Sequence, residues 1–407
     1  MILFPRRSQV AEATTTSTTV PSKLKQLVLN IDPVHDNDVD RIAHLCPNIR
    51  RLYINVNSPT AAGIILQHYE KELEYLNINM YICLITAPPS SEWSPFENEY
   101  RKKNHYNMQQ RLYPNNKPTS RGLRYLALRR FDEATLIQLL HRHADTLEEL
   151  YLYYNNNSFI INNGVFSGLQ NTNSRMLFSN LRVLNISSSN DPTFILTTLL
   201  THVSPTTLQS LQIGSCNLSN NPIVLASIKE LQNLEYLHLN HSIYANRDDV
   251  IELLRHFATK SRSHYHRYRR FYCKQEKHQI QQLQHQSLRS LLISGTYFQL
   301  INDTILQEIG KIETLEKIII NDATKVTEQG LHSFCQVLQQ YNSGYLRCLE
   351  LNHVPSATSK TLEHLLSIPT LKTLILRNVA DDIKMEDFVA FAERGIHVGI
   401  YYLKLRI

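Results

Sequence analysis

One apolar pattern recurs along this chain and organises it. A leucine or isoleucine is followed by further apolar residues three and five positions later, as at Leu24, Leu27 and Leu29. The pattern then starts again at Ile49, Leu73, Leu123, Leu147, Leu181, Leu208, Leu234, Leu288, Leu315, Leu346 and Leu371. Seven of the eleven intervals between successive starts fall between 24 and 27 residues. A period of this length indicates a repeat protein whose stacked units share one core.

Each copy predicts a short strand whose fourth and sixth residues face the core, because side chains alternate along a strand. The rest of the period must return on the other side. Apolar residues at helical spacing follow acidic residues in three of the returning segments, 36–46, 132–143 and 248–257, and acidic residues favour a helix start. We therefore expect an α/β leucine-rich repeat solenoid, a curved horseshoe with a parallel β-sheet on its concave face and helices on its convex face.

Two segments carry a family resemblance. Leu45–Ile54 reads Leu-Cys-Pro-Asn-Ile-Arg-Arg-Leu-Tyr-Ile, and Leu346–Leu351 reads Leu-Arg-Cys-Leu-Glu-Leu. They resemble the long repeats of the ribonuclease-inhibitor-like superfamily, especially its F-box/leucine-rich-repeat group. The resemblance covers residues 24 to about 407. It implies a substrate-recognition subunit of an SCF-type ubiquitin ligase, with ligase components among its partners. The F-box itself is not visible in the Thr-rich residues before Leu24.

The period also predicts the domain organisation. Residues 1–22 form a flexible N-terminal segment, and residues 23–407 form one domain of about 12 repeats with insertions near 81–120 and 260–287. The alternating residues Tyr401–Ile407 predict a final capping strand. The first insertion contains Trp93, the one tryptophan of the chain. It is either a surface loop or a binding loop, since long loops on rigid scaffolds often carry function.

The second insertion holds the charge excess of the whole chain. Residues 260–287 contain seven Lys or Arg and one acid, a net charge of +6 that equals the value for all 407 residues. Basic and aromatic residues alternate here, and the basic candidates are Arg262, Arg267, Arg269, Arg270 and Lys274. Residues 260–277 could bind RNA or an acidic partner, because Arg and Tyr together contact phosphates and stack on bases. The alternative is a solvated, partly packed insertion.

Aromatic and basic residues also recur at the positions that face away from the core. The third, fifth and seventh residues of each copy should line the concave face. This rule selects Arg51, Tyr53, Tyr75, Tyr125, Arg129, Tyr151, Tyr153, Tyr236 and His238. Tyr and Arg are enriched in interface hot spots, which favours a partner-binding surface. Alternatively, neighbouring tyrosines on adjacent strands stabilise the sheet.

Composition argues against an enzyme. The 11 glycines never lie closer than four residues apart, so neither G-x-G-x-x-G nor a P-loop occurs. The six cysteines are at least 13 residues apart, which excludes zinc-finger spacing and suits a reduced compartment, cytoplasmic and/or nuclear. We expect no metal, no cofactor and no membrane partner. The predicted function is a non-enzymatic protein–protein interaction scaffold, with RNA or polyanion binding at 260–277 as the alternative.

Overall fold

A computed structural model describes most of the repeat region. The residues it describes are 24–56, 58–69, 72–80, 122–129, 133–154, 178–188, 193–214, 218, 222–240, 246–272, 287–295, 300–341, 344–380 and 382–401. The predicted N-terminal segment 1–22 and the insertion 81–120 lie outside them. The chain divides into two compact units, Met1–Asn155 and Asn156–Ile407.

The first unit is a parallel sheet with helices between its strands. Neighbouring strands follow the order of the chain, and Arg51 pairs with Tyr75, which pairs with Tyr125. The strands are β1 (Gln26–Val34), β2 (Arg51–Val56), β3 (Tyr75–Met80), β4 (Tyr125–Arg129) and β5 (Glu149–Tyr154). The described helices are α1 (Asp36–Leu45), α2 (Pro59–Tyr69) and α4 (Glu133–His143).

The second unit repeats this arrangement, again with parallel strands in chain order. Its strands are β6 (Val183–Ser188), β7 (Ser210–Gly214), β8 (Tyr236–Asn240), β9 (Ser290–Ser294), β10 (Lys317–Asn321), β11 (Cys348–Asn352), β12 (Thr373–Arg377) and β13 (His397–Tyr401). Its helices are α6 (Thr193–His202), α7 (Pro222–Glu230), α8 (Arg247–Tyr272), α10 (Asp303–Gly310), α11 (Glu328–Tyr341), α12 (Ser359–Leu366), η1 (Met385–Phe388) and α13 (Val389–Glu393).

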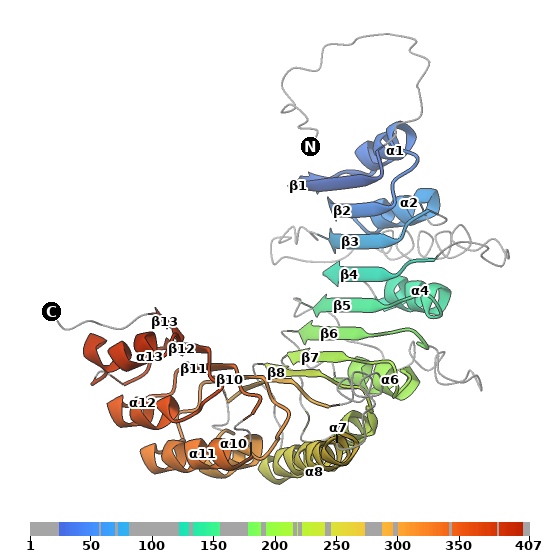
Figure 1. The fold of residues 1–407 in the computed structure, drawn as a ribbon. Coiled ribbons are helices and arrows are strands. Elements are labelled where there is room, and N and C mark those ends of the chain that lie inside the picture. The colour runs from blue at the N-terminus through green and yellow to red at the C-terminus, as the bar shows by residue number, and fades with distance from the viewer. Residues whose placement is uncertain are drawn as a thin grey trace, which may run out of the picture. The chain divides into compact units, whose positions relative to one another are not determined.

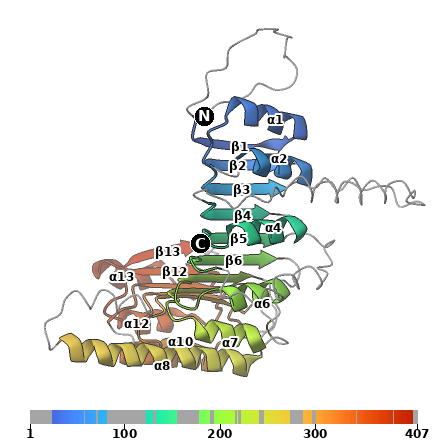
Figure 2. The same ribbon diagram turned by 90° about the vertical axis from the view of Figure 1, so that its right-hand side faces the viewer.

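The predicted fold class, an α/β leucine-rich repeat solenoid, is confirmed in both units. A strand begins two residues after each of the motif starts, and the fourth and sixth motif residues, such as Leu52 and Ile54, are buried. In each unit the helices lie along one face of the sheet (Figures 1 and 2). The other side, which carries no described helix, is called the open face below.

The last described strand lies earlier than the alternation at 401–407 suggests. β13 covers His397–Tyr401 and pairs with β12 in the common register, Leu374 to Val398. Gly395 occupies the first motif position with φ +71°, a conformation that suits glycine, so the apolar search did not find this copy. Residues 402–407 lie outside the described part of the chain.

Polar side chains fasten successive repeats where the strands begin. The second motif residue alternates in charge along much of each unit, and Arg124 pairs with Glu148 at 2.6 Å. In the second unit Arg289 contacts Glu316 at 2.6 Å and the buried Glu235 at 3.8 Å. The backbone adds a ladder here, since the amides of Glu316 and Lys317 both donate to the carbonyl of Arg289. These contacts hold adjacent repeats in one register.

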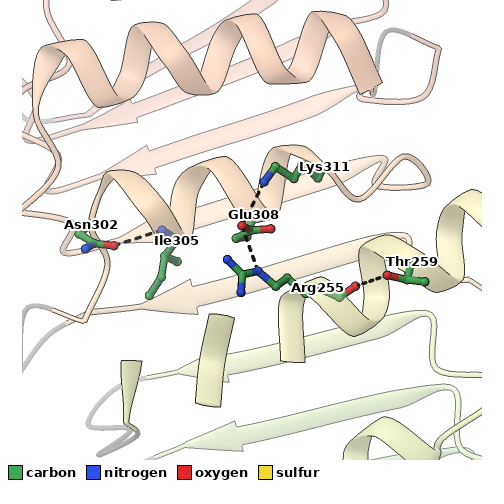
Figure 3. Close-up of polar contacts among 6 residues, drawn as sticks. All are labelled: Arg255, Thr259, Asn302, Ile305, Glu308 and Lys311. Carbon is green, nitrogen blue, oxygen red and sulfur yellow. Dashed lines mark hydrogen bonds and ion pairs between the residues drawn. The ribbon is translucent and has the colours of Figure 1, made fainter. Parts of the chain in front are cut away.

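Helix α8 is the longest described helix and is anchored on the neighbouring repeat. Arg255 of α8 lies 3.2 Å from the buried carboxylate of Glu308 on α10 (Figure 3). Lys311, at the C-terminal end of α10, contacts the same carboxylate at 3.0 Å. Asn302 caps α10 by accepting a hydrogen bond from the amide of Ile305 (Figure 3). The helix then continues through Lys260 to Tyr272, into the segment predicted as the second insertion.

Candidate functional site

Four tyrosines form a continuous stack across the open face of the first unit. Tyr53 and Tyr75 have ring centroids 4.6 Å apart, Tyr75 and Tyr125 lie 3.7 Å apart and nearly parallel, and Tyr125 and Tyr151 lie 5.1 Å apart. These residues come from β2, β3, β4 and β5 in turn. We call the four residues the tyrosine stack.

Strand register explains why the four rings meet. Tyr75 and Tyr125 are both third motif residues, so they sit directly opposite each other. Tyr53 and Tyr151 are fifth motif residues and reach the stack diagonally, which aromatic side chains are long enough to do. Between Tyr125 and Tyr151 the sheet carries the small Ala127, which is 3% exposed. An alanine at this position leaves room for the two rings to approach.

Four tyrosines of this face, Tyr75, Tyr125, Tyr151 and Tyr153, have raised pKa values and keep their hydroxyl protons at neutral pH. Burial, with the neighbouring hydroxyl groups of Tyr125 and Tyr53, raises the pKa of Tyr75 well above its ordinary range. Burial is also the main cause that raises the pKa values of Tyr125, Tyr151 and Tyr153. The face is therefore lined by neutral rings whose hydroxyl groups donate hydrogen bonds.

Two arginines and one acid flank the stack. Arg51 is exposed at the start of β2, and the Arg129 guanidinium lies 5.0 Å from the ring centroid of Tyr153. Within the described residues, neither arginine has a carboxylate within ion-pair distance. Glu149 accepts a hydrogen bond of 3.0 Å from the Tyr151 hydroxyl group. All of these residues belong to β2, β4 and β5 of the first unit.

The remaining two candidates of the predicted concave surface lie in the second unit. Tyr236 and His238 project from β8, and Tyr236 is 41% exposed. Burial and the nearby Lys317 lower the pKa of His238, so its imidazole is neutral at pH 7. The structure thus brings the candidates on β2, β3, β4 and β5 together in the first unit, and this pair belongs to the second unit.

Two basic residues of the segment 260–277 make contacts with neighbouring repeats. Arg262 lies 3.4 Å from Glu313, and its guanidinium lies 4.7 Å from the ring centroid of Tyr341 on α11. Lys260 donates to the carbonyl groups of Leu231 and Gln232 at 3.0 and 2.7 Å. Both residues therefore anchor α8 on the solenoid.

The other basic candidates lie further along the chain. Arg267, Arg269 and Arg270 lie on the continuing backbone of α8, and their side chains fall outside the described part. Lys274 lies beyond the helix and also falls outside it.

One polar cluster escaped the sequence reasoning. His353 Nδ1 donates a hydrogen bond to Asp322 Oδ1 at 2.9 Å, and Asn378 Nδ2 donates to His353 Nε2 at 2.6 Å. All three residues directly follow a strand and have positive φ, between 48° and 56°. Asn, Asp and His are the non-glycine residues that tolerate this conformation best, so aligning the repeats at the eighth position would have found them. Both ring nitrogens of His353 are occupied, which fits a structural role.

Metal and membrane sites are not apparent in the described part of the chain. There, no group of three or more His, Cys, Asp or Glu side chains could hold a metal ion. No helix in these segments combines the length and apolar character needed to cross a bilayer.

Comparison with known proteins gives structural likenesses alone. No protein-family model matches the chain, and no curated protein sequence matches it. The chain is similar to a chain in the crystal structure of the Rad7 and Elc1 complex in yeast, with 14% identity and a TM-score of 0.47 over 88% of this chain and 70% of that one. It is also similar to a chain of the TLR13–ssRNA13 complex, with 14% identity and a TM-score of 0.34 over 63% of this chain and 29% of that one.

Proposed function

We propose that this chain is a non-enzymatic scaffold that binds a protein partner on the open face of its first unit. The observation that carries the proposal is the tyrosine stack, which runs unbroken from β2 to β5. Arg51, Arg129 and Tyr153 complete the surface. Further amide groups come from Asn55, Asn77 and Asn79, which project from the same face.

This combination of side chains suits protein recognition. Surfaces selected for protein binding are rich in Tyr, Asn and Arg, because tyrosine gives a large amphipathic contact at a low cost in conformational entropy. Rings that already pack against each other have lost most of that freedom before a partner arrives. A preorganised surface binds more tightly because less ordering remains to be done.

The two outer rings of the stack offer the sharpest test. Tyr53 and Tyr151 each have one stacked neighbour, so replacing both with alanine removes binding surface while the Tyr75–Tyr125 pair remains. Tyr401 provides a control, because it is an exposed strand tyrosine of the second unit that lies outside the tyrosine stack and contacts Arg377. Circular dichroism would establish that the variants fold.

The measurement is affinity purification from source cells, followed by direct binding of the purified partner. The partner should bind the wild-type chain and the Tyr401→Ala variant equally. It should bind the Tyr53→Ala/Tyr151→Ala variant at least tenfold more weakly, as expected for loss of interface anchors. A partner that binds all three proteins with the same affinity would contradict the proposal.

A finer proposal follows from the resemblance to F-box/leucine-rich-repeat proteins. In this version the scaffold presents its bound partner to a ubiquitin ligase as a substrate. Purification of the native chain should then recover cullin-type ligase components along with the partner. Recovery of the partner without any such component would remove the ligase role and leave the scaffold role in place.

A second candidate function, binding of RNA or another polyanion, is favoured by the charge distribution. The net charge of +6 at 260–287 equals that of the whole chain, and α8 carries this segment on a continuous helix as far as Tyr272. Because Lys260 and Arg262 already contact the solenoid, a polyanion would rely on Arg267, Arg269 and Arg270. Neutralising these three should abolish the binding.

A further inference from the structure

The open face of the first unit has an unbalanced charge. Its exposed arginines are Arg51 on β2 and Arg129 on β4, and neither has an ion-pair partner among the described residues. Among the described side chains of this face the one acid is Glu149, which accepts a hydrogen bond from the hydroxyl group of Tyr151. The surface therefore offers two guanidinium groups and several hydroxyl donors, and it offers few acceptors for a basic ligand.

The stacking geometry limits what can lie on the tyrosines. Tyr75 is covered by Tyr53 on one side and by Tyr125 on the other, and Tyr125 lies between Tyr75 and Tyr151. A nucleobase or a sugar ring binds by stacking on an aromatic face, and neither inner ring has a free one. On the two inner rings, what remains accessible is the ring edges and the hydroxyl groups. This arrangement favours a ligand that runs across the edges, as an extended peptide does.

The register of the strands sets the spacing of the two positive charges. Arg51 is in line with Tyr125, two strands away, and Arg129 lies four residues further along β4. Two strand separations of about 4.8 Å and four residues of about 3.3 Å give a diagonal of roughly 16 Å. An extended peptide covers that distance with about five residues.

We propose that the partner of this scaffold contributes an extended acidic segment, in which two Asp or Glu side chains about five residues apart pair with Arg51 and Arg129. This inference rests on the proposed function and names the chemistry of the partner. Between the two ion pairs the segment crosses the tyrosine stack. Burial raises the pKa of Tyr125, so its hydroxyl group keeps its proton and donates a hydrogen bond to the peptide backbone or to a further carboxylate, whereas the hydroxyl proton of Tyr151 is already donated to Glu149. Val28, exposed on β1 beside Tyr53, extends the surface with an apolar contact.

The test is a selection of peptides from a random displayed library on the immobilised full-length chain. Selected peptides should be enriched in acidic pairs separated by four to six positions, and fluorescence anisotropy with the synthetic peptides would give their affinities. Arg51→Gln and Arg129→Gln should each weaken binding by about tenfold or more, since each removes a charge-assisted hydrogen bond. Arg41→Gln, at an exposed position on α1, is the matched control and should leave the affinity unchanged.

Two outcomes separate this inference from the proposed function. The first outcome is that selected peptides need Tyr53 and Tyr151 but contain no acidic pair. The second is that they bind the Arg51→Gln and Arg129→Gln variants normally. Either result would contradict the proposed acidic segment and would leave the scaffold proposal in place. Failure to select any peptide that the Tyr53→Ala/Tyr151→Ala variant loses would contradict both. Preferential binding of single-stranded polyuridine that Arg51→Gln abolishes would replace the peptide with RNA.

Discussion

The buried carboxylate of Glu308 allows a quantitative prediction about what holds α8 on the solenoid. Its side chain is 6% exposed and has two cationic partners, Arg255, which is 62% exposed, and Lys311, which is 33% exposed. Replacing either cation with methionine keeps most of its apolar stem and leaves one partner for the carboxylate. Each single substitution should therefore cost about 1 kcal/mol, as expected for a solvent-exposed ion pair.

The double substitution should cost far more than the sum of its parts. Without Arg255 and Lys311 the carboxylate of Glu308 remains buried and uncompensated, and such a change typically costs 3–5 kcal/mol. We therefore expect Arg255→Met/Lys311→Met to lower the free energy of unfolding by at least about 3 kcal/mol. The coupling energy between the two sites should then be at least about 1 kcal/mol, larger than the error of additivity for independent sites.

Urea unfolding followed by circular dichroism would measure these values, and amide hydrogen exchange of α8 and α10 would locate the loss, because repeat arrays need not unfold in one step. The control is the same set of variants, Arg255→Met, Lys311→Met and the double variant, made in a chain that also carries Glu308→Gln. A neutral amide needs no cation, so the coupling should fall below about 0.5 kcal/mol there. If the two single costs simply add in the wild-type background, or if the coupling persists with Glu308→Gln, the reasoning about the buried charge is wrong.

Three further predictions concern other parts of the chain. Three rings of the tyrosine stack should titrate late: because burial raises the pKa values of Tyr75, Tyr125 and Tyr151 above that of an unfolded tyrosine, stability is full below about pH 10 and falls as the pH rises above it. Absorbance of tyrosinate recorded alongside unfolding would check this, and normal titration of all tyrosines in the folded chain would contradict it. His143 behaves in the opposite sense: burial lowers its pKa to about 4, so its contribution is present above about pH 6.5 and is lost as the pH falls towards 4. If the assigned ring C–H resonance of His143 titrates near the ordinary pKa of histidine, then His143 is solvated and this prediction is wrong. Finally, if α8 binds polyanions, affinity for polyuridine should drop steeply with salt, and Gln at Arg267, Arg269 and Arg270 should abolish it, whereas unchanged binding would remove that function.

Most of the fold follows from local sequence patterns. A strand appears two residues after every motif start, and acidic residues in the first turns of α1 and α8 mark where those helices begin. This works because each repeat contacts its neighbours alone, so a periodic pattern is sufficient to place strand, helix and core. Among the described strands, β13 is the one that the apolar pattern does not predict, since Gly395 replaces the apolar residue that opens the motif.

The sequence by itself also determined which side chains leave the core, and it could not determine which of them meet. Tyr75 and Tyr125 stack despite the long insertion between β3 and β4, and Tyr236 lies in the other unit although it obeys the same rule. Arg262, which the sequence offers as a basic binding candidate, packs on Tyr341 of α11. Alternation along a strand determines on which face of the sheet a side chain lies. Its lateral neighbours depend on register and on packing between helices distant in the chain, which only the tertiary structure decides.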